Sequence, residues 1–229
     1  MLQLITMKQK VHQDLYSTIQ MNSVNAHVGN HLVLNPRIIK GIYRMKQIPV
    51  IQPSRPPLAR IRRIIFDTLE HRHKMVKVLD LCCGSGSLGL EALSRGASEV
   101  VFIDKDASVI QNLNQTIKRW HIPTDIVNPK ARTYVCDATR VKITECFDTI
   151  FVDLPFLHKK ENIILSNILS NNLANTDSII VVKSIKNHHY NHDGFEVIKQ
   201  KDEGRSSVIF FKRKIELDIE NKQFEKQSI

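Results

Sequence analysis

The chain has 229 residues, and its 33 lysines and arginines against 23 aspartates and glutamates give a formal net charge of +10. This length fits one domain with appendages, and the charge favours an anionic partner, either nucleic acid or a membrane surface, although a merely basic soluble protein has the same balance. The four cysteines (Cys82, Cys83, Cys136, Cys146) exclude a disulfide framework and lack metal-ligand spacing, while the apolar runs fall short of the ~20 residues that span a bilayer.

The first 57 residues divide into two parts. Residues 1–34 show no sustained apolar period and are expected to form an extension without a readable function. Residues 35–57 are basic, and the part around Gly41 is expected to form a short pair of strands. Lysine and arginine neutralise phosphates, and tyrosine stacks on bases, so this arm is a candidate RNA contact through Arg37, Lys40, Tyr43, Arg44 and Arg55. A solvated basic loop explains the same residues.

A helix is expected from Leu58 to about Glu70. Its apolar residues (Leu58, Ile61, Ile65, Leu69) recur with a helical period and form a core-facing stripe. Arg60, Arg62 and Arg63 are expected on the rest of its surface, and Arg60 is added to the candidate RNA contacts.

The most informative stretch is K-V-L-D-L-C-C-G-S-G-S-L-G, residues 77–89. An apolar run ends at closely spaced glycines and a helix from Leu88 to Arg95 follows, which predicts a strand, a tight turn and a helix. Helix N-terminal N–H groups then face the turn, and glycines allow a ligand to approach the backbone. The pattern predicts a nucleotide-like ligand at Cys82, Gly84 and Gly86.

Asp80 discriminates between two such ligands. Gly84, Gly86 and Gly89 satisfy G-x-G-x-x-G, with Asp104 twenty residues past Gly84, so a nicotinamide-dependent dehydrogenase is an open alternative. A carboxylate at Asp80 would crowd a pyrophosphate, whereas it accepts hydrogen bonds from an amino acid's ammonium group. The preferred ligand is therefore S-adenosylmethionine.

Two further strands are expected to end in acids. Residues 99–104 end at Asp104, which is placed to hold two ribose hydroxyls, and Asp106 is expected to cap the next helix. Residues 133–136 end at Asp137, which either meets the adenine amino group or forms a turn.

The segment F-D-T-I-F-V-D-L-P-F predicts a fourth buried strand that ends in Asp153, Leu154, Pro155 and Phe156. The Asp153 carboxylate and the Leu154 carbonyl can accept hydrogen bonds from an exocyclic amine, while Phe156 stacks on the base. Pro155 restricts the backbone of Leu154 and so orients that carbonyl. This arrangement suits methyl transfer to an amine, with these four residues as the catalytic candidates, although a strand ending in a proline turn is the alternative.

The remaining residues complete an α/β fold. His158 and Lys159 follow the fourth strand and are candidate RNA contacts, and a helix is expected over residues 161–171. A fifth strand (178–183) and a final pair (195–199 and 207–212, turning at Gly204) predict a seven-stranded, mostly parallel sheet with one antiparallel strand. Residues 58–212 would form this domain, and residues 213–229 a charged tail. The working expectation is a cytoplasmic monomer.

These motifs resemble the RsmD family of bacterial methyltransferases over about residues 37–212. The resemblance lies in R-I-I-K-G-I-Y-R, R-P-P-L-A-R-I-R-R-I-I-F, the block from Gly84 to Ala97, F-I-D-K-D and D-L-P-F. It implies a class I, Rossmann-like methyltransferase fold, S-adenosylmethionine as cofactor, and methylation of guanine N2 in 16S ribosomal RNA or a small-subunit assembly particle. It implies cofactor roles for Asp80, Gly84, Gly86, Asp104 and Asp137, and a target-amine role for residues 153–156.

The chain departs from the family at three places. Leu154 replaces the first proline of D-P-P-F, Met45 replaces a usual glycine in the arm, and Pro57 and Arg63 differ from the usual R-P-T and R-E. Two alternatives to the guanine methyltransferase therefore remain: an enzyme for another nucleic-acid amine, such as adenine in DNA or RNA, or a non-catalytic RNA-binding assembly factor.

Overall fold

The computed structural model describes residues 35–50, 59–70, 73, 75–125, 127, 130–154, 160–186 and 192–214. The strands are β1 (Lys77–Leu81), β2 (Glu99–Asp104), β3 (Ala131–Val135), β4 (Thr149–Asp153), β5 (Ile179–Ile185), β6 (Phe195–Glu203) and β7 (Ser206–Arg213). The helices are α2 (Ala59–Glu70), α3 (Ser87–Ser94), α4 (Ala107–Arg119) and α5 (Glu161–Ser170), with a 3₁₀ turn η1 (Ala138–Arg140).

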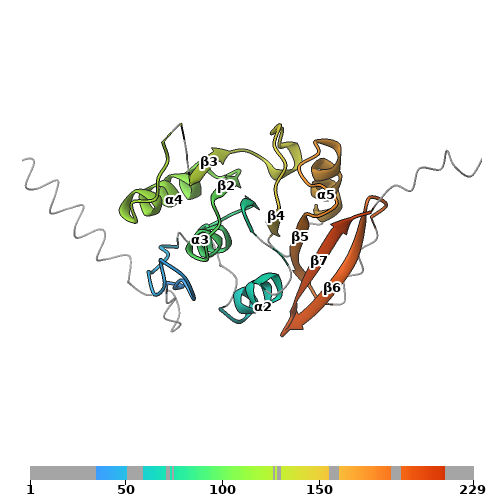
Figure 1. Ribbon diagram of the computed structural model, residues 1–229, viewed down its shortest axis with the longest axis horizontal. Coiled ribbons are helices and arrows are strands. Elements are labelled where there is room, and N and C mark those ends of the chain that lie inside the picture. The colour runs from blue at the N-terminus through green and yellow to red at the C-terminus, as the bar shows by residue number, and fades with distance from the viewer. Residues whose placement is uncertain are drawn as a thin grey trace, which may run out of the picture. The chain divides into compact units, whose positions relative to one another are not determined.

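The seven strands form one sheet in the order β3-β2-β1-β4-β5-β7-β6 (Figure 1). Strands β1 to β5 pair in parallel, and β7 runs antiparallel to both of its neighbours, β5 and β6. The predicted fold class is confirmed, including the single antiparallel strand near the edge.

Helices cover both faces of the sheet because the central strands are apolar on both sides. On one face Phe102, Phe151 and Val181 pack with the buried residues of α2, α3 and α4. On the other face Val101, Ile150 and Val182 pack with α5. The chain reverses its direction of growth across the sheet between β1 and β4, and open α/β sheets bind ligands at the carboxyl ends of the strands at such a point.

Several element boundaries differ from the sequence prediction by one to four residues. Strand β3 begins at Ala131 rather than Thr133, because Ala131 already pairs with Val100 of β2. Strand β6 extends to Glu203 rather than Lys199, since its whole length pairs with β7. Gly204 turns this hairpin with φ of +59°, as predicted.

The arm over residues 35–50 differs from the predicted strand pair. It forms one antiparallel bridge, between Arg37 and Gln47, closed by consecutive turns. Ile38 and Ile48 are buried in the core on the α3 side, which fixes both ends of the loop. Backbone hydrogen bonds from Ile38 to Lys46 and from Ile48 to Pro36 flank the bridge, and turn hydrogen bonds fill the loop between.

Helix α3 holds this arm through hydrogen bonds that the sequence did not reveal. The buried Glu91 carboxylate accepts from the backbone N–H groups of Ile39 (2.8 Å) and Lys40 (3.1 Å). The Ser94 hydroxyl accepts from Tyr43 N–H (2.9 Å) and donates to the Lys40 carbonyl (2.5 Å). Two residues of the motif L-E-A-L-S-R-G-A, Glu91 and Ser94, therefore hold the backbone of the arm against helix α3.

The expectation that Arg62 lies on the surface of its helix is wrong. Arg62 is only 1% exposed, and its Nη2 donates to the Arg37 carbonyl at 2.8 Å. Arg62 thus links α2 to the arm instead of facing solvent.

Met45 adopts a left-handed conformation, with φ of +68°. This geometry costs a non-glycine residue roughly 1–2 kcal/mol, while glycine loses about 0.5–1 kcal/mol more backbone entropy on folding. We expect Met45→Gly to raise the free energy of unfolding by up to about 1 kcal/mol, as measured by urea unfolding. Asn172→Gly is the control, because asparagine already tolerates its φ of +50°. An equal gain in both variants would contradict the argument.

Candidate functional site

The turn after β1 has the backbone geometry that its glycines predicted. Cys82, Gly84 and Gly86 have φ values of +57°, +53° and +72°, and helix α3 begins at the next residue, Ser87. A Cβ atom on Gly86 would lie 2.7 Å from the end of the Leu113 side chain of α4, so close packing adds to the positive φ in favouring glycine there. The hydroxyl of buried Ser85 has no hydrogen-bond partner among the described residues.

Asp80 lies at the base of this turn and is 1% exposed. Its Oδ2 accepts a hydrogen bond from the Gly89 N–H at 2.9 Å, so the carboxylate satisfies a backbone donor in the first turn of helix α3. Its other oxygen has no partner within the described part of the chain. Burial raises the pKa of Asp80 well above its usual range, which the hydrogen bond from Gly89 and a bound cationic group would both oppose.

Asp104 ties the end of β2 to the glycine turn. Its Oδ2 accepts from the Gly84 N–H (2.9 Å) and its Oδ1 from the Asp106 N–H (3.0 Å). Asp106 in turn caps α4 by accepting from the Ser108 N–H at 2.8 Å, which confirms its predicted structural role. Asp104 is therefore the acid that borders the turn.

Asp137 takes the turn-forming role that the sequence left open. One of its oxygens, Oδ1, accepts from the backbone N–H (2.9 Å) and the hydroxyl (2.8 Å) of Thr139. Those two hydrogen bonds lower the pKa of Asp137. A ligand contact through its second oxygen remains a prediction.

Asp153 ends β4 beside a residue that sequence reasoning missed, Lys183 of β5. The two are register partners, and the Lys183 ammonium donates to Asp153 Oδ1. The adjacent Leu154 is buried in the core on the α5 side. Pro155, Phe156, His158 and Lys159 lie outside the described residues.

The charges of the four predicted acids all act on one thiol, that of Cys82. Strand register puts Asp80, Asp104 and Asp153 on the sheet face of Phe102 and Phe151. Burial raises the pKa of the Cys82 thiol to about 12, and the carboxylates of Asp104, Asp153, Asp80 and Asp137 add to the effect. The turn after β1 is thus the common centre of residues that are up to 73 positions apart in the sequence.

These residues fit the methyl donor expected from the sequence. The oxygen of buried Asp80 that lacks a partner suits an ammonium group, and Asp104 still has lone pairs for hydroxyl hydrogens. The positive-φ turn allows close approach to the backbone.

Among the described residues, three of the predicted RNA contacts interact with other side chains rather than with one another. Lys40 pairs with Glu70 at 3.0 Å, and Arg60 with Glu203 at 3.4 Å. Tyr43 is half-buried, with its ring 5.5 Å from that of Trp120, so it is less available to stack on a base than expected. Arg37 and Arg44 are exposed, and Arg55 lies outside the described residues.

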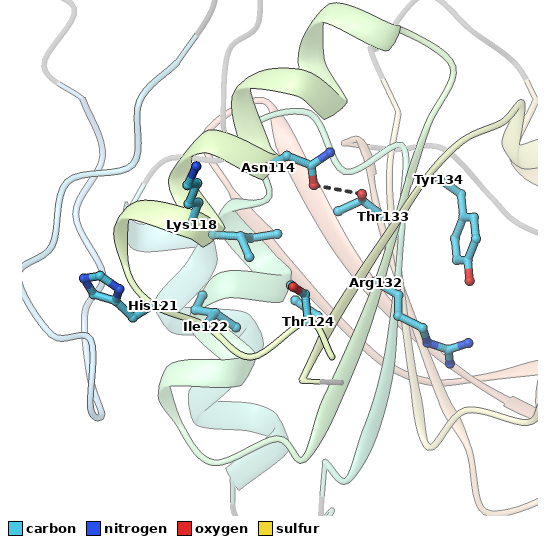
Figure 2. Close-up of a pocket in the computed structure, with 10 residues that line it drawn as sticks. Asn114, Lys118, His121, Ile122, Thr124, Arg132, Thr133 and Tyr134 are labelled. Atoms are coloured by element: carbon cyan, nitrogen blue, oxygen red, sulfur yellow. Dashed lines mark hydrogen bonds between the residues drawn. The ribbon is translucent and has the colours of Figure 1, made fainter. Parts of the chain in front are cut away.

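An open pocket of about 650 Å³ lies elsewhere, between α4 and the edge strand β3 (Figure 2). Asn114 of α4 accepts from the Thr133 hydroxyl of β3 at 2.9 Å across it. None of the predicted cofactor or catalytic residues lines this pocket, so it does not belong to the acidic site.

No helix among the described residues has the length and apolar character to cross a membrane. The described residues also contain no group of three or more His, Cys, Asp or Glu side chains that could bind a metal ion.

Known proteins resemble the chain in sequence and in structure. Ribosomal RNA small subunit methyltransferase D of Haemophilus influenzae is 30% identical over 155 residues, which is 66% of this chain and 79% of that protein. Putative rRNA methyltransferase YlbH of Bacillus subtilis is 29% identical over 154 residues, covering 64% of this chain and 81% of the relative. The solved structure of a putative methyltransferase from Escherichia coli matches with a TM-score of 0.69 at 27% identity, covering 79% of this chain and 98% of the other.

A family model extends over most of the described region. Residues 36–212 match the family described as "Conserved hypothetical protein 95". This span includes the glycine turn, all four acids, and all but the first residue of the arm and the last residue of the β6–β7 hairpin. The chain therefore belongs to this family, the RsmD family that its motifs resemble.

Proposed function

We propose that the protein is an S-adenosylmethionine-dependent methyltransferase that methylates the exocyclic N2 of a guanine in 16S ribosomal RNA. The observation that carries the proposal is the placement of Asp104, Asp80 and Asp153 toward the carboxyl ends of the adjacent strands β2, β1 and β4, on one face of the sheet, beside the glycine turn and at the point where the sheet reverses. Family membership and the names of the relatives from Haemophilus influenzae and Bacillus subtilis support an RNA substrate.

Each acid has a role in this proposal. Asp80 binds the ammonium group of the donor, Asp104 the ribose hydroxyls, and Asp137 the adenine amino group through its second oxygen. S-adenosylmethionine, when bound, supplies an electrophilic methyl group. Asp153 accepts a hydrogen bond from the target amine and so orients its lone pair, because an acceptor on the N–H side leaves the nitrogen lone pair free to attack.

The RNA is expected to reach the site along positively charged residues. The exposed Arg37 and Arg44 of the arm supply phosphate contacts, and His158 and Lys159 follow the target-amine segment in sequence. The protein would act as a cytoplasmic monomer on this RNA or on a small-subunit assembly particle.

The decisive experiment combines labelled S-adenosylmethionine with small-subunit RNA and with particles from cells that lack this modification. The RNA is digested to nucleosides and analysed by mass spectrometry, with a known methyltransferase as active control. N2-methylguanosine supports the proposal. Label in adenosine favours the enzyme for another amine, and RNA binding without any label favours the non-catalytic assembly factor.

The two acids at the end of β2 provide a matched pair. Asp104→Ala removes a charged acceptor worth about 1.5–3 kcal/mol, so S-adenosylmethionine should bind roughly 10–100-fold more weakly by calorimetry. Asp106→Ala removes only the cap of α4, which costs about 1 kcal/mol of stability and leaves cofactor affinity unchanged. Equal affinities in the two variants would remove Asp104 from the site.

A further inference from the structure

Lys183 and Asp153 form a buried ion pair at the carboxyl ends of two adjacent strands. They are register partners in the parallel β4–β5 pairing, so their side chains project from the same face of the sheet. Lys183 is 9% exposed and the Asp153 side chain 14%. The Lys183 ammonium donates to Oδ1 of Asp153.

The second oxygen of Asp153 is unused by the described residues. Oδ2 accepts no hydrogen bond from any of them, whereas Oδ1 is held by Lys183. A carboxylate that is gripped at one oxygen by a buried strand residue cannot rotate freely. Its other oxygen is then a fixed acceptor beside the acidic turn.

We propose that Lys183 is a positioning residue for the methyl transfer: it grips Asp153 Oδ1 and so leaves Oδ2 as a fixed acceptor for the target amine. This inference rests on the proposed function. It assigns a role to a residue that neither the glycine turn nor the D-L-P-F segment contains.

Charge gives Lys183 a second effect on the same carboxylate. Burial raises the pKa of Asp153, and the ammonium of Lys183 opposes that rise. Among the described residues, Asp80 on β1 and the Cys82 thiol after it also interact electrostatically with Asp153, and neither is a cation. Without Lys183 the pKa of Asp153 would rise further, and a protonated Asp153 would no longer be an acceptor at both oxygens.

Loss of the Lys183 charge is expected to shift the pH dependence of methyl transfer. Activity needs ionised Asp153, so it is lost as pH falls through the pKa of that group. Lys183→Met raises this pKa, so the acidic limb of the kcat profile should move to higher pH. If the pKa rises a unit above the assay pH, the ionised fraction and kcat fall roughly 10-fold, while KM for RNA changes little.

The test uses the full chain and two readouts. The first is the ¹³C titration of aspartate side-chain carboxyls by NMR without cofactor or RNA, with the Asp153 signal assigned by its loss in Asp153→Asn. The second is the kcat profile against pH. Lys183→Met should shift both to higher pH, and Lys183→Arg should restore both, because it returns the positive charge.

Lys186→Met is the matched control. Lys186 follows the same strand and lies 3.8 Å from Asp202 on the surface, so its loss should change neither readout. Lys183→Gln serves as a second neutral variant if Lys183→Met fails to fold.

The outcomes separate the inference from the function it rests on. An unchanged Asp153 titration in the neutral variants overturns the inference even when the wild-type protein methylates guanine. A shifted titration with no change in the kcat profile of an active enzyme also overturns it, since Lys183 is then only structural. A wild-type chain that transfers no methyl group refutes the proposed function, whereas the NMR titration still reports on the ion pair.

Discussion

Asp153→Ala is expected to lower methyl transfer by about 10²-fold or more while RNA binding persists. In the proposed reaction the carboxylate orients the target amine, and misplacement of a reacting group by about 1 Å costs on the order of 10²-fold in rate. The exposed Arg37 and Arg44, which are proposed to contact phosphates, belong to the arm and not to the end of β4, so the affinity for RNA should stay within about 2-fold of wild type. Single-turnover assays with saturating enzyme would measure the transfer step, and filter binding the RNA affinity.

A second variant distinguishes a loss of catalysis from a loss of folding. Asp153→Ala breaks the buried ion pair with Lys183, and breaking such a pair costs about 3–5 kcal/mol. The double variant Asp153→Ala/Lys183→Met removes both charges and should recover much of that stability without recovering activity. Near wild-type transfer in the folded double variant would show that Asp153 takes no part in the chemistry.

The order of the elements was predictable because it depends on local patterns. The apolar run, the glycines and the following helix predicted β1, the turn and α3 to within a residue at each boundary. Asp106 was recognisable as a cap because the residue that it serves, Ser108, is two positions away. Such short-range hydrogen bonds leave a signal in the sequence.

The interactions that were missed join distant segments. Lys183 was read only as the last residue of a strand, and its pairing with Asp153 depends on the register between β4 and β5. Arg62 was expected on the surface because its position in the helix does not reveal that the arm covers it. A single sequence gives periodicity and turn chemistry, but it does not give the register and docking that decide these contacts.

Glu91 explains why the arm and α3 should unfold together. The carboxylate is fully buried, accepts hydrogen bonds from two backbone N–H groups of the arm, and forms an ion pair with Arg95 at 2.8 Å. The Arg95 side chain is only 3% exposed. Removing Glu91 takes the buried carboxylate away from Arg95, which keeps its ion pair with the more exposed Glu70, and it leaves two backbone donors of the arm without this acceptor.

Glu91→Ala should therefore lower the free energy of unfolding by about 3–5 kcal/mol in urea denaturation. Glu70→Ala is the matched control, because Glu70 also pairs with Arg95 (2.7 Å) but its side chain is 29% exposed. Its loss should cost about 1 kcal/mol or less, since solvent screens the pair. Proteolysis within residues 35–50 should also become faster in Glu91→Ala than in Glu70→Ala, because only Glu91 holds the backbone of the arm. Similar losses of stability in both variants would mean that the arm is held by Ile38, Ile48 and Ser94 rather than by the buried carboxylate.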